Sequence, residues 1–421
     1  MSAVATFAHD TARSFRYRNF RLFFFGQIIS MIGYWAQLVA QAILVLELTD
    51  SGSWLGFVTA LQFLPILVVG PYAGVMSDRL DKRRVMLVTQ SAMMACALLL
   101  GFLVLVDWIS LPVLMVVAVM AGTAWAFDQP SRRTLVTELV DEDDATNAVS
   151  LNGALVNGAK IFGPAVAAGL IPAVGVGWCY VFNGLTSAAV VTALYRMDPA
   201  AIRRPPAASA AEQEHSRMRD ALRYIWDLPS LRVPTLLLGW VSVLSFNWNV
   251  LMPLIATRAL EGDAGTLAVL MGGSSVGGVA GSLWTASRHS VGATFVAAAA
   301  VVYGVSALAV GVAPEIVTAA VASIAVGGFA LAFFNGGVAA LQLGAAPIMR
   351  GRVMAVYGMV VLGSNAVGAP LTGWAADTIG SRPTAALGGV AASLAGLGSY
   401  AFLRGGGRTD LSPEMIEEAT T

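Results

Sequence analysis

The feature that most constrains this chain is a regular alternation of long apolar stretches with short polar ones. One bilayer crossing needs about 20 apolar residues in an α-helix, and the sequence contains twelve stretches of that kind. They lie near residues 19–46, 54–76, 85–106, 111–130, 148–171, 178–196, 232–256, 265–287, 292–312, 315–342, 353–375 and 384–403. Only 12% of the residues are charged, against about 25% in a soluble chain. The sequence therefore predicts an all-α membrane protein with twelve spans.

The basic residues fall almost entirely in every second connection between these stretches. If the N-terminus is cytoplasmic, the cytoplasmic segments hold all but three of the 25 Lys and Arg residues, the exceptions being Lys160, Arg258 and Arg382. Positive charge concentrates on the cytoplasmic side of membrane proteins. We therefore expect a multi-pass protein of the plasma (inner) membrane with both termini in the cytoplasm. The first twenty residues are polar and basic, unlike a cleavable signal peptide.

A polar stretch near the middle divides the chain. Residues 1–197 and 232–404 each contain six apolar stretches and predict two six-helix bundles, and residues 405–421 form a cytoplasmic tail. Between the bundles, residues 198–231 end with Met218, Ala221, Leu222 and Ile225 at helical spacing. An amphipathic helix of this kind suits the inner membrane surface, with a partner-binding helix as the alternative. We expect a cytoplasmic linker.

The two halves share a glycine pattern. A shift of 205 residues places Gly122, Gly153, Gly158, Gly163, Gly175 and Gly184 on Gly327, Gly358, Gly363, Gly368, Gly380 and Gly389. Parallel repeats of six spans are typical of transporters in which two bundles move about a central site. We therefore expect two pseudo-symmetric bundles.

A charge-dense loop joins the second and third stretches, with the sequence Gly74-Val75-Met76-Ser77-Asp78-Arg79-Leu80-Asp81-Lys82-Arg83-Arg84. A cytoplasmic position explains the basic residues of this loop, but it does not explain an acidic residue. Asp78 could accept hydrogen bonds from a helix N-terminus or pair with Arg132 or Arg133 at the same membrane face. We interpret these residues as a cytoplasmic gate, with a purely topogenic loop as the alternative. The gate candidates are Gly74, Asp78, Arg79, Arg83, Arg132 and Arg133.

This loop resembles the loop 2–3 signature of the major facilitator superfamily. The family pattern usually has Gly where Asp81 stands. The resemblance implies the major facilitator fold, with twelve transmembrane helices and alternating access. The corresponding loop of the second half, residues 281–288, contains no Asp. We therefore expect a gate of this kind on the cytoplasmic side alone.

The fifth stretch contains the segment Gly158-Ala159-Lys160-Ile161-Phe162-Gly163-Pro164. A proline inside a helix removes one backbone hydrogen bond and bends the helix. The segment resembles the Gly-Pro motif of antiporters in the superfamily, which implies a hinge at Gly158, Gly163 and Pro164. Ala167-Ala168 stands where that motif has a second glycine pair. The alternative is a helix that packs through small residues without bearing on transport direction.

Two further segments narrow the resemblance. Leu48-Thr49-Asp50-Ser51-Gly52 follows the first stretch, and Ala126-Phe127-Asp128-Gln129-Pro130-Ser131-Arg132-Arg133 ends the fourth. They resemble the enterobactin-exporter-like branch of drug and siderophore efflux proteins. That branch implies export of a small, amphiphilic molecule in exchange for protons. The alternatives are a proton-coupled importer of a metabolite in the same fold, a membrane-embedded enzyme and a sensor.

Polar residues inside the apolar stretches are costly in lipid and therefore mark functional candidates. Amides, aromatic rings and the one basic side chain of the spans suit a substrate cavity. The cavity candidates are Gln37, Gln41, Trp125, Asn157, Lys160, Asn247, Trp248, Asn335 and Asn365. Lys160 would bind an anionic substrate, pair with an acid or reach the interface. Asp128 and Glu47 are the proton-coupling candidates; the alternatives are a structural pair with Arg132 or Arg133 for Asp128 and an interfacial acid for Glu47.

Several classes of protein and site do not fit the sequence. It has no Cys/His metal cluster, no phosphate-binding Gly-Lys-Ser/Thr loop and no His-Glu-x-x-His motif. We therefore expect no metal, no cofactor, no nucleic acid partner and no enzymatic activity. We expect a monomer whose partners are the lipid bilayer, a small-molecule substrate and protons. Cys96 and Cys179 are distant in sequence and are expected to stay unpaired.

Overall fold

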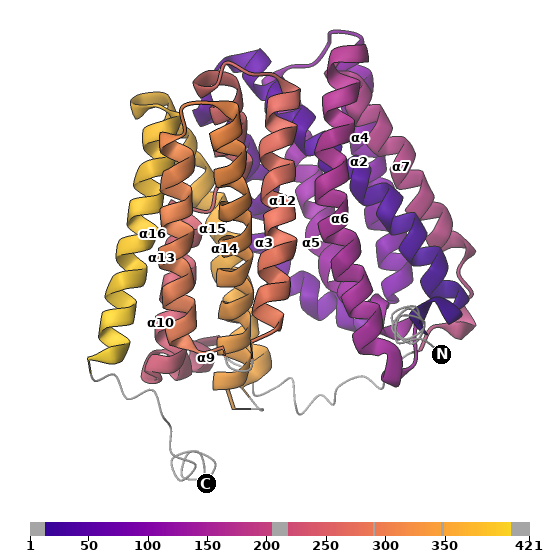
Figure 1. The fold of residues 1–421 in the computed structure, drawn as a ribbon. Coiled ribbons are helices and arrows are strands. Elements are labelled where there is room, and N and C mark those ends of the chain that lie inside the picture. Colours follow the sequence, from indigo (N-terminus) through magenta and orange to yellow (C-terminus); the bar gives the residue numbers. More distant parts are fainter. Residues whose placement is uncertain (1–12, 204–217, 289–290, 347–348, 406–421) are drawn as a thin grey trace, which may run out of the picture. The chain divides into compact units, whose positions relative to one another are not determined.

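A computed structural model of the chain describes residues 13–203, 218–288, 291–346 and 349–405. Most of the expected tail and the middle of the expected linker lie outside these ranges. The side chains at 71, 74, 75, 77, 78, 79 and 362 also lie outside the description. Every regular element of the described part is helical (Figure 1).

The helices follow one another with short connections. In the first half they are η1 (Arg13–Arg16), α2 (Arg18–Thr49), α3 (Gly52–Arg79), α4 (Lys82–Leu105), α5 (Leu111–Glu138), α6 (Glu142–Val174), α7 (Val176–Arg196) and η2 (Pro199–Ala201). In the second half they are α9 (Met218–Asp227), α10 (Pro229–Leu244), α11 (Trp248–Leu254), the π-helical turn η3 (Ile255–Ala259), α12 (Ala264–Ala286), α13 (Ala293–Val312), α14 (Ile316–Gly344), α15 (Arg350–Ile379) and α16 (Ser381–Arg404).

Twelve segments in the described part are long and apolar enough to cross a membrane, which confirms the expected number. The seventh, Pro229–Ala259, combines α10, α11 and η3 and is interrupted at residues 245–247. Several helices run past the expected boundaries. The apolar stretch of α5 was expected to end near residue 130, but the helix continues through Pro130 to Glu138, because an internal proline removes only one hydrogen bond.

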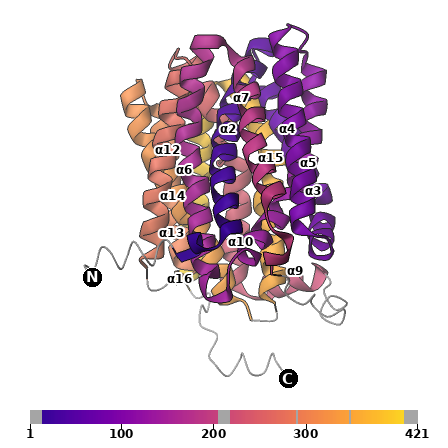
Figure 2. The same cartoon turned by 90° about the vertical axis from the view of Figure 1, so that its right-hand side faces the viewer.

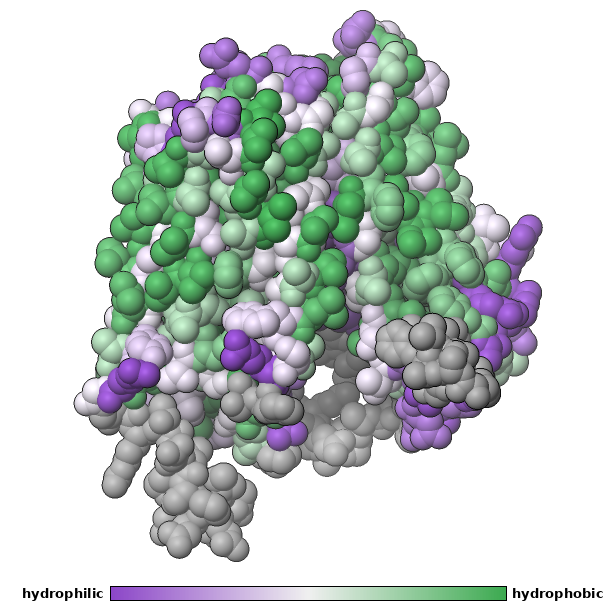
Figure 3. All heavy atoms as spheres, viewed as in Figure 1, coloured by the Kyte–Doolittle hydropathy of each residue, from purple (hydrophilic) through white to green (hydrophobic). Residues whose placement is uncertain are grey.

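The helix sides in view are largely hydrophobic, and hydrophilic residues gather near helix ends (Figure 3). Large apolar side chains such as Val68, Phe102 and Leu185 are 57–64% exposed. Exposed apolar surface of this extent would aggregate in water but is stable against lipid. The chain is a multi-pass membrane protein.

The described helices belong to two compact units, which do not divide at the middle of the sequence. The first unit draws on Met1–Asp50, Leu61–Ala208 and Leu267–Gly272, and the second on Ser51–Ala60, Ser209–Thr266 and Gly273–Thr421. Helix α3 is therefore divided, with its first residues in the second unit and the remainder in the first. Helix α12 has a middle stretch, Leu267–Gly272, in the first unit and both of its ends in the second.

In the first unit, α2 lies beside α6 and α7, and α4 lies beside α5 and α7 (Figures 1 and 2). Phe20, Phe23, Met86 and Leu194 form part of a fully buried cluster near one end of these helices. In the second unit, α13 packs between α14 and α16, and α10 contacts α15. The burial of these apolar faces holds the helices of the candidate site in their positions.

Glycines that the 205-residue shift pairs make equivalent contacts in the two halves. A Cβ at Gly122 of α5 would collide with the Gln62 carbonyl oxygen of α3, and one at Gly327 of α14 with the Ser274 carbonyl oxygen of α12. Gly184 of α7 likewise packs on α4, and Gly389 of α16 packs on α13. Because each pair joins corresponding helices of the two halves, the contacts support the repeat.

The turns between the last two spans of each half are also equivalent. Gly175 separates α6 from α7 with φ 95° and ψ 166°, and Gly380 separates α15 from α16 with φ 95° and ψ 154°. Side chains other than glycine strongly disfavour this backbone region. The repeat therefore extends to a shared turn geometry.

The expected amphipathic helix of the linker is α9. Ala221 and Ile225 are buried, whereas Leu222 and Trp226 are more than half exposed. The Tyr224 hydroxyl accepts a hydrogen bond from the backbone N–H of Ala346 at 3.1 Å. One face of α9 is therefore attached to the second unit, and the other presents apolar side chains.

Candidate functional site

A buried ion pair lies inside the first unit. Asp128 and Arg132 are one helical turn apart on α5, which places both on the same helix face. The Asp128 carboxylate is 0% exposed and Arg132 is 5% exposed. One carboxylate oxygen accepts a hydrogen bond from Nε of Arg132 at 2.9 Å, and a second guanidinium nitrogen donates to the same oxygen. The charges therefore neutralise each other out of contact with solvent.

This ion pair connects α5 to two other helices. The second oxygen of Asp128 accepts hydrogen bonds from the Thr89 hydroxyl and from the Gln90 amide of α4, each at 2.9 Å. On the other side, a guanidinium nitrogen of Arg132 lies 3.7 Å from the Met31 sulfur of α2. The carboxylate thus accepts four hydrogen bonds. A change at Asp128 would therefore alter the contacts among α2, α4 and α5.

A small enclosed cavity lies in the same unit, among α2, α3, α4, α5 and α7. Its volume is about 30 Å³, enough for a water molecule but not for a drug-sized compound. The residues around it are Tyr34, Gln37, Gln41, Gln62, Met93, Cys96, Leu100, Leu114, Val117, Ala118, Ala121, Trp125 and Asn183. Three predicted cavity residues, Gln37, Gln41 and Trp125, are therefore brought together here.

The amides around this cavity bond to one another. The side-chain amide of Asn183 donates to Oε1 of Gln37 at 2.6 Å, and the side-chain amide of Gln41 donates to Oε1 of Gln62 at 3.4 Å. Trp125 packs against Phe63 with its ring centroid 5.6 Å away. In this arrangement the amides join α2 to α7 and α2 to α3.

Lys160 of α6 lies against α2. Its ammonium nitrogen is 5.2 Å from the centroid of the Trp35 ring, a cation–π distance. Asn157, also partly buried, precedes it by one helical turn. The indole N–H of Trp35 is buried without a hydrogen-bond acceptor among the described residues. A cation and an unsatisfied donor therefore occur side by side on the α2–α6 contact.

The predicted hinge residues of α6 differ in their surroundings. A Cβ at Gly163 would collide with the Cβ of Trp35, whereas a Cβ at Gly158 would meet nothing within 4 Å. Pro164 is buried inside the helix. Gly163 thus permits close packing of α6 on α2, and Gly158 has no packing requirement in this conformation.

The predicted gate residues are described only in part. The side chains of Gly74, Asp78 and Arg79 lie outside the description, so their gating role stays a prediction. Arg83 donates to the carbonyl oxygens of Leu194 and Tyr195 at 2.6 and 2.9 Å. It therefore binds the C-terminal end of α7. Arg132 bonds to Asp128 as described above, and its neighbour Arg133 is exposed.

The remaining candidates occupy separate places. In the second unit, the Asn247 amide donates to the Val243 carbonyl oxygen at 2.8 Å where the seventh span is interrupted, and the Trp248 indole donates to the Tyr303 hydroxyl at 3.0 Å. Asn335 is exposed and donates to the Ser282 hydroxyl at 3.1 Å. Asn365 donates to the Val361 carbonyl oxygen of its own helix at 3.4 Å. Glu47 is exposed near the end of α2.

Comparison with known proteins matches residues 10–413 to a family described as transmembrane secretion effectors of the major facilitator type. The chain belongs to this family. It is 28% identical over 155 residues to the staphyloferrin A transporter of Staphylococcus aureus, and 30% identical over 159 residues to the macrolide efflux protein A of Streptococcus pyogenes. These alignments cover 37% and 36% of this chain, and 39% of each relative.

The fold of this major facilitator protein is also found among solved structures. An inward-facing, unoccupied structure of a bacterial homologue of the human lysosomal transporter Spinster superimposes with a TM-score of 0.71 at 14% identity. The superposition covers 94% of this chain and 98% of that chain. The two relatives are named as a transporter and an efflux protein, and neither is named as an enzyme.

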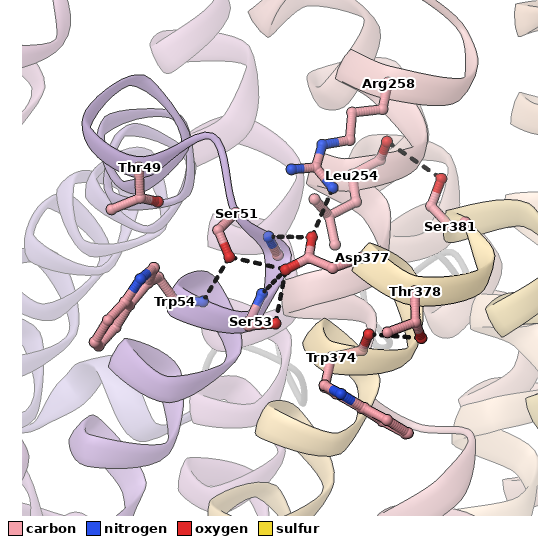
Figure 4. Close-up of polar contacts among 12 residues, drawn as sticks. Thr49, Ser51, Ser53, Trp54, Leu254, Arg258, Trp374, Asp377, Thr378 and Ser381 are labelled. Atoms are coloured by element: carbon pink, nitrogen blue, oxygen red, sulfur yellow. Dashed lines mark hydrogen bonds and ion pairs between the residues drawn. The ribbon is translucent and has the colours of Figure 1, made fainter.

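One polar cluster of the chain was not expected from the sequence. The Asp377 carboxylate of α15 receives hydrogen bonds from the backbone N–H groups of Gly52 and Ser53 at 2.7 and 2.8 Å (Figure 4). The hydroxyls of Ser51 and Ser53 donate to it at 2.8 and 2.6 Å, and Arg258 donates at 2.8 Å. The carboxylate therefore caps the N-terminus of α3 within the second unit.

The charge pattern held a signal for this cluster. Arg258 is one of the three basic residues outside the segments that the sequence predicts to be cytoplasmic. The acid that pairs with it, Asp377, lies 119 positions away in the sequence. The pattern could have drawn attention to Arg258, but not to Asp377.

Proposed function

We propose that this protein is a transporter that exports a small, amphiphilic molecule across the plasma membrane in exchange for protons, by alternating access. The proposal includes cytoplasmic termini and a monomer that needs no cofactor. It is supported by the name of the macrolide efflux protein among its relatives. Because the alignments cover 39% of each relative, substrate, direction and coupling belong to the proposal.

The observation that carries the proposal is the buried Asp128–Arg132 pair. Exchange for protons requires a group that binds a proton in one state and releases it in another. Protonation of Asp128 would remove its negative charge and leave Arg132 buried without a counter-ion, which is costly. Arg132 would then move away from Asp128 and disturb its contact with Met31 on α2. In this way one proton would change the packing of three helices.

The substrate site of the proposal lies along α2. Lys160 and the Trp35 ring would contact a charged or aromatic part of the substrate, with Asn157 beside them. The cavity lined by Gln37 and Gln41 is too small for a drug-sized compound, and its amides bond to one another. It would enlarge when those bonds break, and the freed amides would then bind the substrate.

The proposed cytoplasmic gate and the Asp377 cap lie at opposite ends of α3. Asp78 stands near the C-terminal end of this helix, and Asp377 caps its N-terminal end. The ends are separated by roughly 40 Å at 1.5 Å per residue. Asp78 and Arg79 at the end of α3, together with Arg133 of α5, would close the cytoplasmic side in one state. Release of Gly52 and Ser53 from Asp377 would accompany opening of the other side.

The test uses inside-out membrane vesicles that contain the protein. A proton gradient is imposed across their membrane to drive uptake. Vesicles that contain the wild-type protein should accumulate a fluorescent amphiphilic dye, a macrolide or a siderophore from a panel of such compounds. Asp78→Asn and Asp128→Asn should each reduce the rate at least tenfold. Gradient-driven uptake into intact cells would overturn the export direction in favour of import. Binding of a compound without accumulation in sealed vesicles would indicate a sensor instead.

A further inference from the structure

A groove lies on the surface of the first unit between α2 and α7. Its volume is about 440 Å³. Its sides consist of apolar or small residues, namely Leu22, Phe25 and Ile29 of α2 with Ala189, Thr192 and Ala193 of α7. Phe25 is 57% exposed and Ile29 is 45% exposed. We call this surface the α2–α7 groove.

The floor of the groove is a close contact between two helix backbones. A Cβ at Gly26 would lie 2.8 Å from the Cβ of Ala193 and 3.0 Å from the Cα of Val190. Small residues at this crossing let α2 and α7 approach each other, while the longer side chains on either side form walls. The shape of the groove is therefore set by packed helices rather than by a loop.

Two arginines line the same groove at one end. Arg21 lies in the first turn of α2, and Arg196 is the last residue of α7. Both are exposed, and neither guanidinium makes an ion pair or side-chain hydrogen bond within the described ranges. The Asn19 amide donates to the Asp198 carbonyl oxygen at 2.9 Å, and the Asp198 N–H donates to Asn19 at 3.1 Å. These bonds hold the two helix ends together.

The C-terminal end of α7 would ordinarily repel an anion, because its last carbonyl groups carry partial negative charge. Arg83 donates hydrogen bonds to two of these carbonyls, those of Leu194 and Tyr195. Its positive charge therefore offsets the negative end of the helix. The end of α7 that carries Arg196 is therefore less repulsive to an anion than a bare helix C-terminus.

We propose that the α2–α7 groove binds one anionic phospholipid of the surrounding bilayer. Its phosphate lies between Arg21 and Arg196, and an acyl chain lies along Phe25 and Ile29 over the Gly26–Ala193 crossing. Basic sites between transmembrane helices on the cytoplasmic side bind anionic headgroups. The apolar walls select a lipid over a soluble phosphate, because a phosphate without an acyl chain leaves them uncovered. This inference is independent of the substrate and direction proposed above.

The experiment measures lipid retention by native mass spectrometry of the purified, detergent-solubilised protein. The protein is titrated with phosphatidylglycerol or with phosphatidylcholine of the same acyl chains. The wild type should retain one phosphatidylglycerol at least about tenfold more strongly than phosphatidylcholine. Arg21→Gln/Arg196→Gln should reduce phosphatidylglycerol retention at least about tenfold, as expected from losing two charges near the membrane surface.

Two further variants separate this site from general attraction of lipid to surface charge. Arg18→Gln removes an exposed charge from the same turn of α2, at a position outside the groove, and should leave retention within twofold of wild type. Thr192→Trp keeps both arginines but fills the groove and should reduce retention severalfold. Equal effects of Arg18→Gln and Arg21→Gln, or wild-type retention in Thr192→Trp, would overturn the site. Size-exclusion profiles and melting curves identify variants that fail to fold, and for these the Arg21→Gln and Arg196→Gln single variants replace the double variant.

Discussion

Arg258 donates a hydrogen bond to the Asp377 carboxylate at 2.8 Å, although 119 positions separate the two residues in the sequence. The side chains are 31% and 24% exposed. Arg382, the other arginine that departs from the cytoplasmic charge pattern, donates to the carbonyl oxygens of Ala259 and Pro314 at 3.0 and 3.2 Å. Both exceptions therefore bind nearby groups of the second unit. An arginine placed against the general charge pattern here has a structural role.

The first prediction concerns Asp377. In Asp377→Asn the side chain keeps its shape, but one of the acceptor atoms becomes a donor and the charge is lost. The N–H groups of Gly52 and Ser53 and the Arg258 guanidinium then lose a charged acceptor. We expect the free energy of unfolding to fall by about 1–3 kcal/mol, measured as a lower thermal midpoint in detergent. We also expect transport to slow.

Glu47→Gln is the matched control for Asp377→Asn. Glu47 is also an acid near the end of a span, but it is exposed, and its neutralisation should change stability by less than about 0.5 kcal/mol. Arg258→Gln combined with Asp377→Asn should cost less than the sum of the single changes, since both remove the same bond. Equal stability of Asp377→Asn and Glu47→Gln would show that the cap contributes nothing.

The second prediction compares two adjacent arginines. Arg132→Ala leaves the buried Asp128 carboxylate without its counter-ion and should destabilise the protein by about 3–5 kcal/mol. Arg133→Ala removes an exposed charge next to it and should cost less than about 0.5 kcal/mol. Thermal unfolding monitored by tryptophan fluorescence measures both. The idea of a buried pair is wrong if the two variants melt at the same temperature.

The number of spans and the internal repeat were predictable because each depends on local sequence. An apolar stretch forms a span wherever it is long enough. A glycine such as Gly175 or Gly380 permits its turn conformation by its own lack of a side chain. The contacts of Gly122 and Gly327 confirm the same alignment of the halves. These features need no knowledge of which distant residues meet.

The polar contacts were less predictable because they join distant residues. The sequence indicated that Asp128 could bond to Arg132 one turn away, and it does. The sequence does not specify that Asp377 meets Gly52, or that Arg83 binds the end of α7, since each contact depends on helix packing. The roles of Gly74, Asp78 and Arg79 stay predictions, because their side chains lie outside the described part.

The third prediction concerns Lys160 and the charge of the substrate. If its ammonium group attracts an anionic part of the substrate, Lys160→Met should reduce transport of anionic compounds at least tenfold and affect cationic compounds much less. Lys160→Arg keeps the charge and the contact with the Trp35 ring, and should retain much of the activity. Transport rates in vesicles across a panel of charged dyes measure this. Equal losses for anions and cations in Lys160→Met would indicate a structural role.

The fourth prediction is a pH dependence at the start of α12. The backbone N–H of Thr266 donates to Asp263 at 3.0 Å, and this hydrogen bond lowers the pKa of the carboxyl group. Because this pKa is lower in the folded than in the unfolded state, the ionised carboxylate stabilises the protein at pH values above the unfolded pKa of about 4. This contribution is lost as the pH falls through the folded pKa. Asp263→Ala should therefore cost about 1 kcal/mol at pH 7 and less at pH 3. Asp263→Asn, an uncharged cap, should show no such pH dependence in melting curves.

The last prediction separates two glycines of the α6 motif. Gly163→Ala places a methyl group against the Cβ of Trp35 and the backbone of Ala36, and should destabilise the protein by about 1–3 kcal/mol through overpacking. Gly158→Ala adds a methyl group where nothing lies within 4 Å, and should be neutral or stabilising by up to about 1 kcal/mol, since alanine favours the helix. Melting curves test packing, and transport rates test the hinge. If Gly158→Ala keeps its stability but transports slowly, Gly158 acts as a hinge during the cycle; if both properties match wild type, the hinge role of Gly158 is refuted and close packing at Gly163 remains.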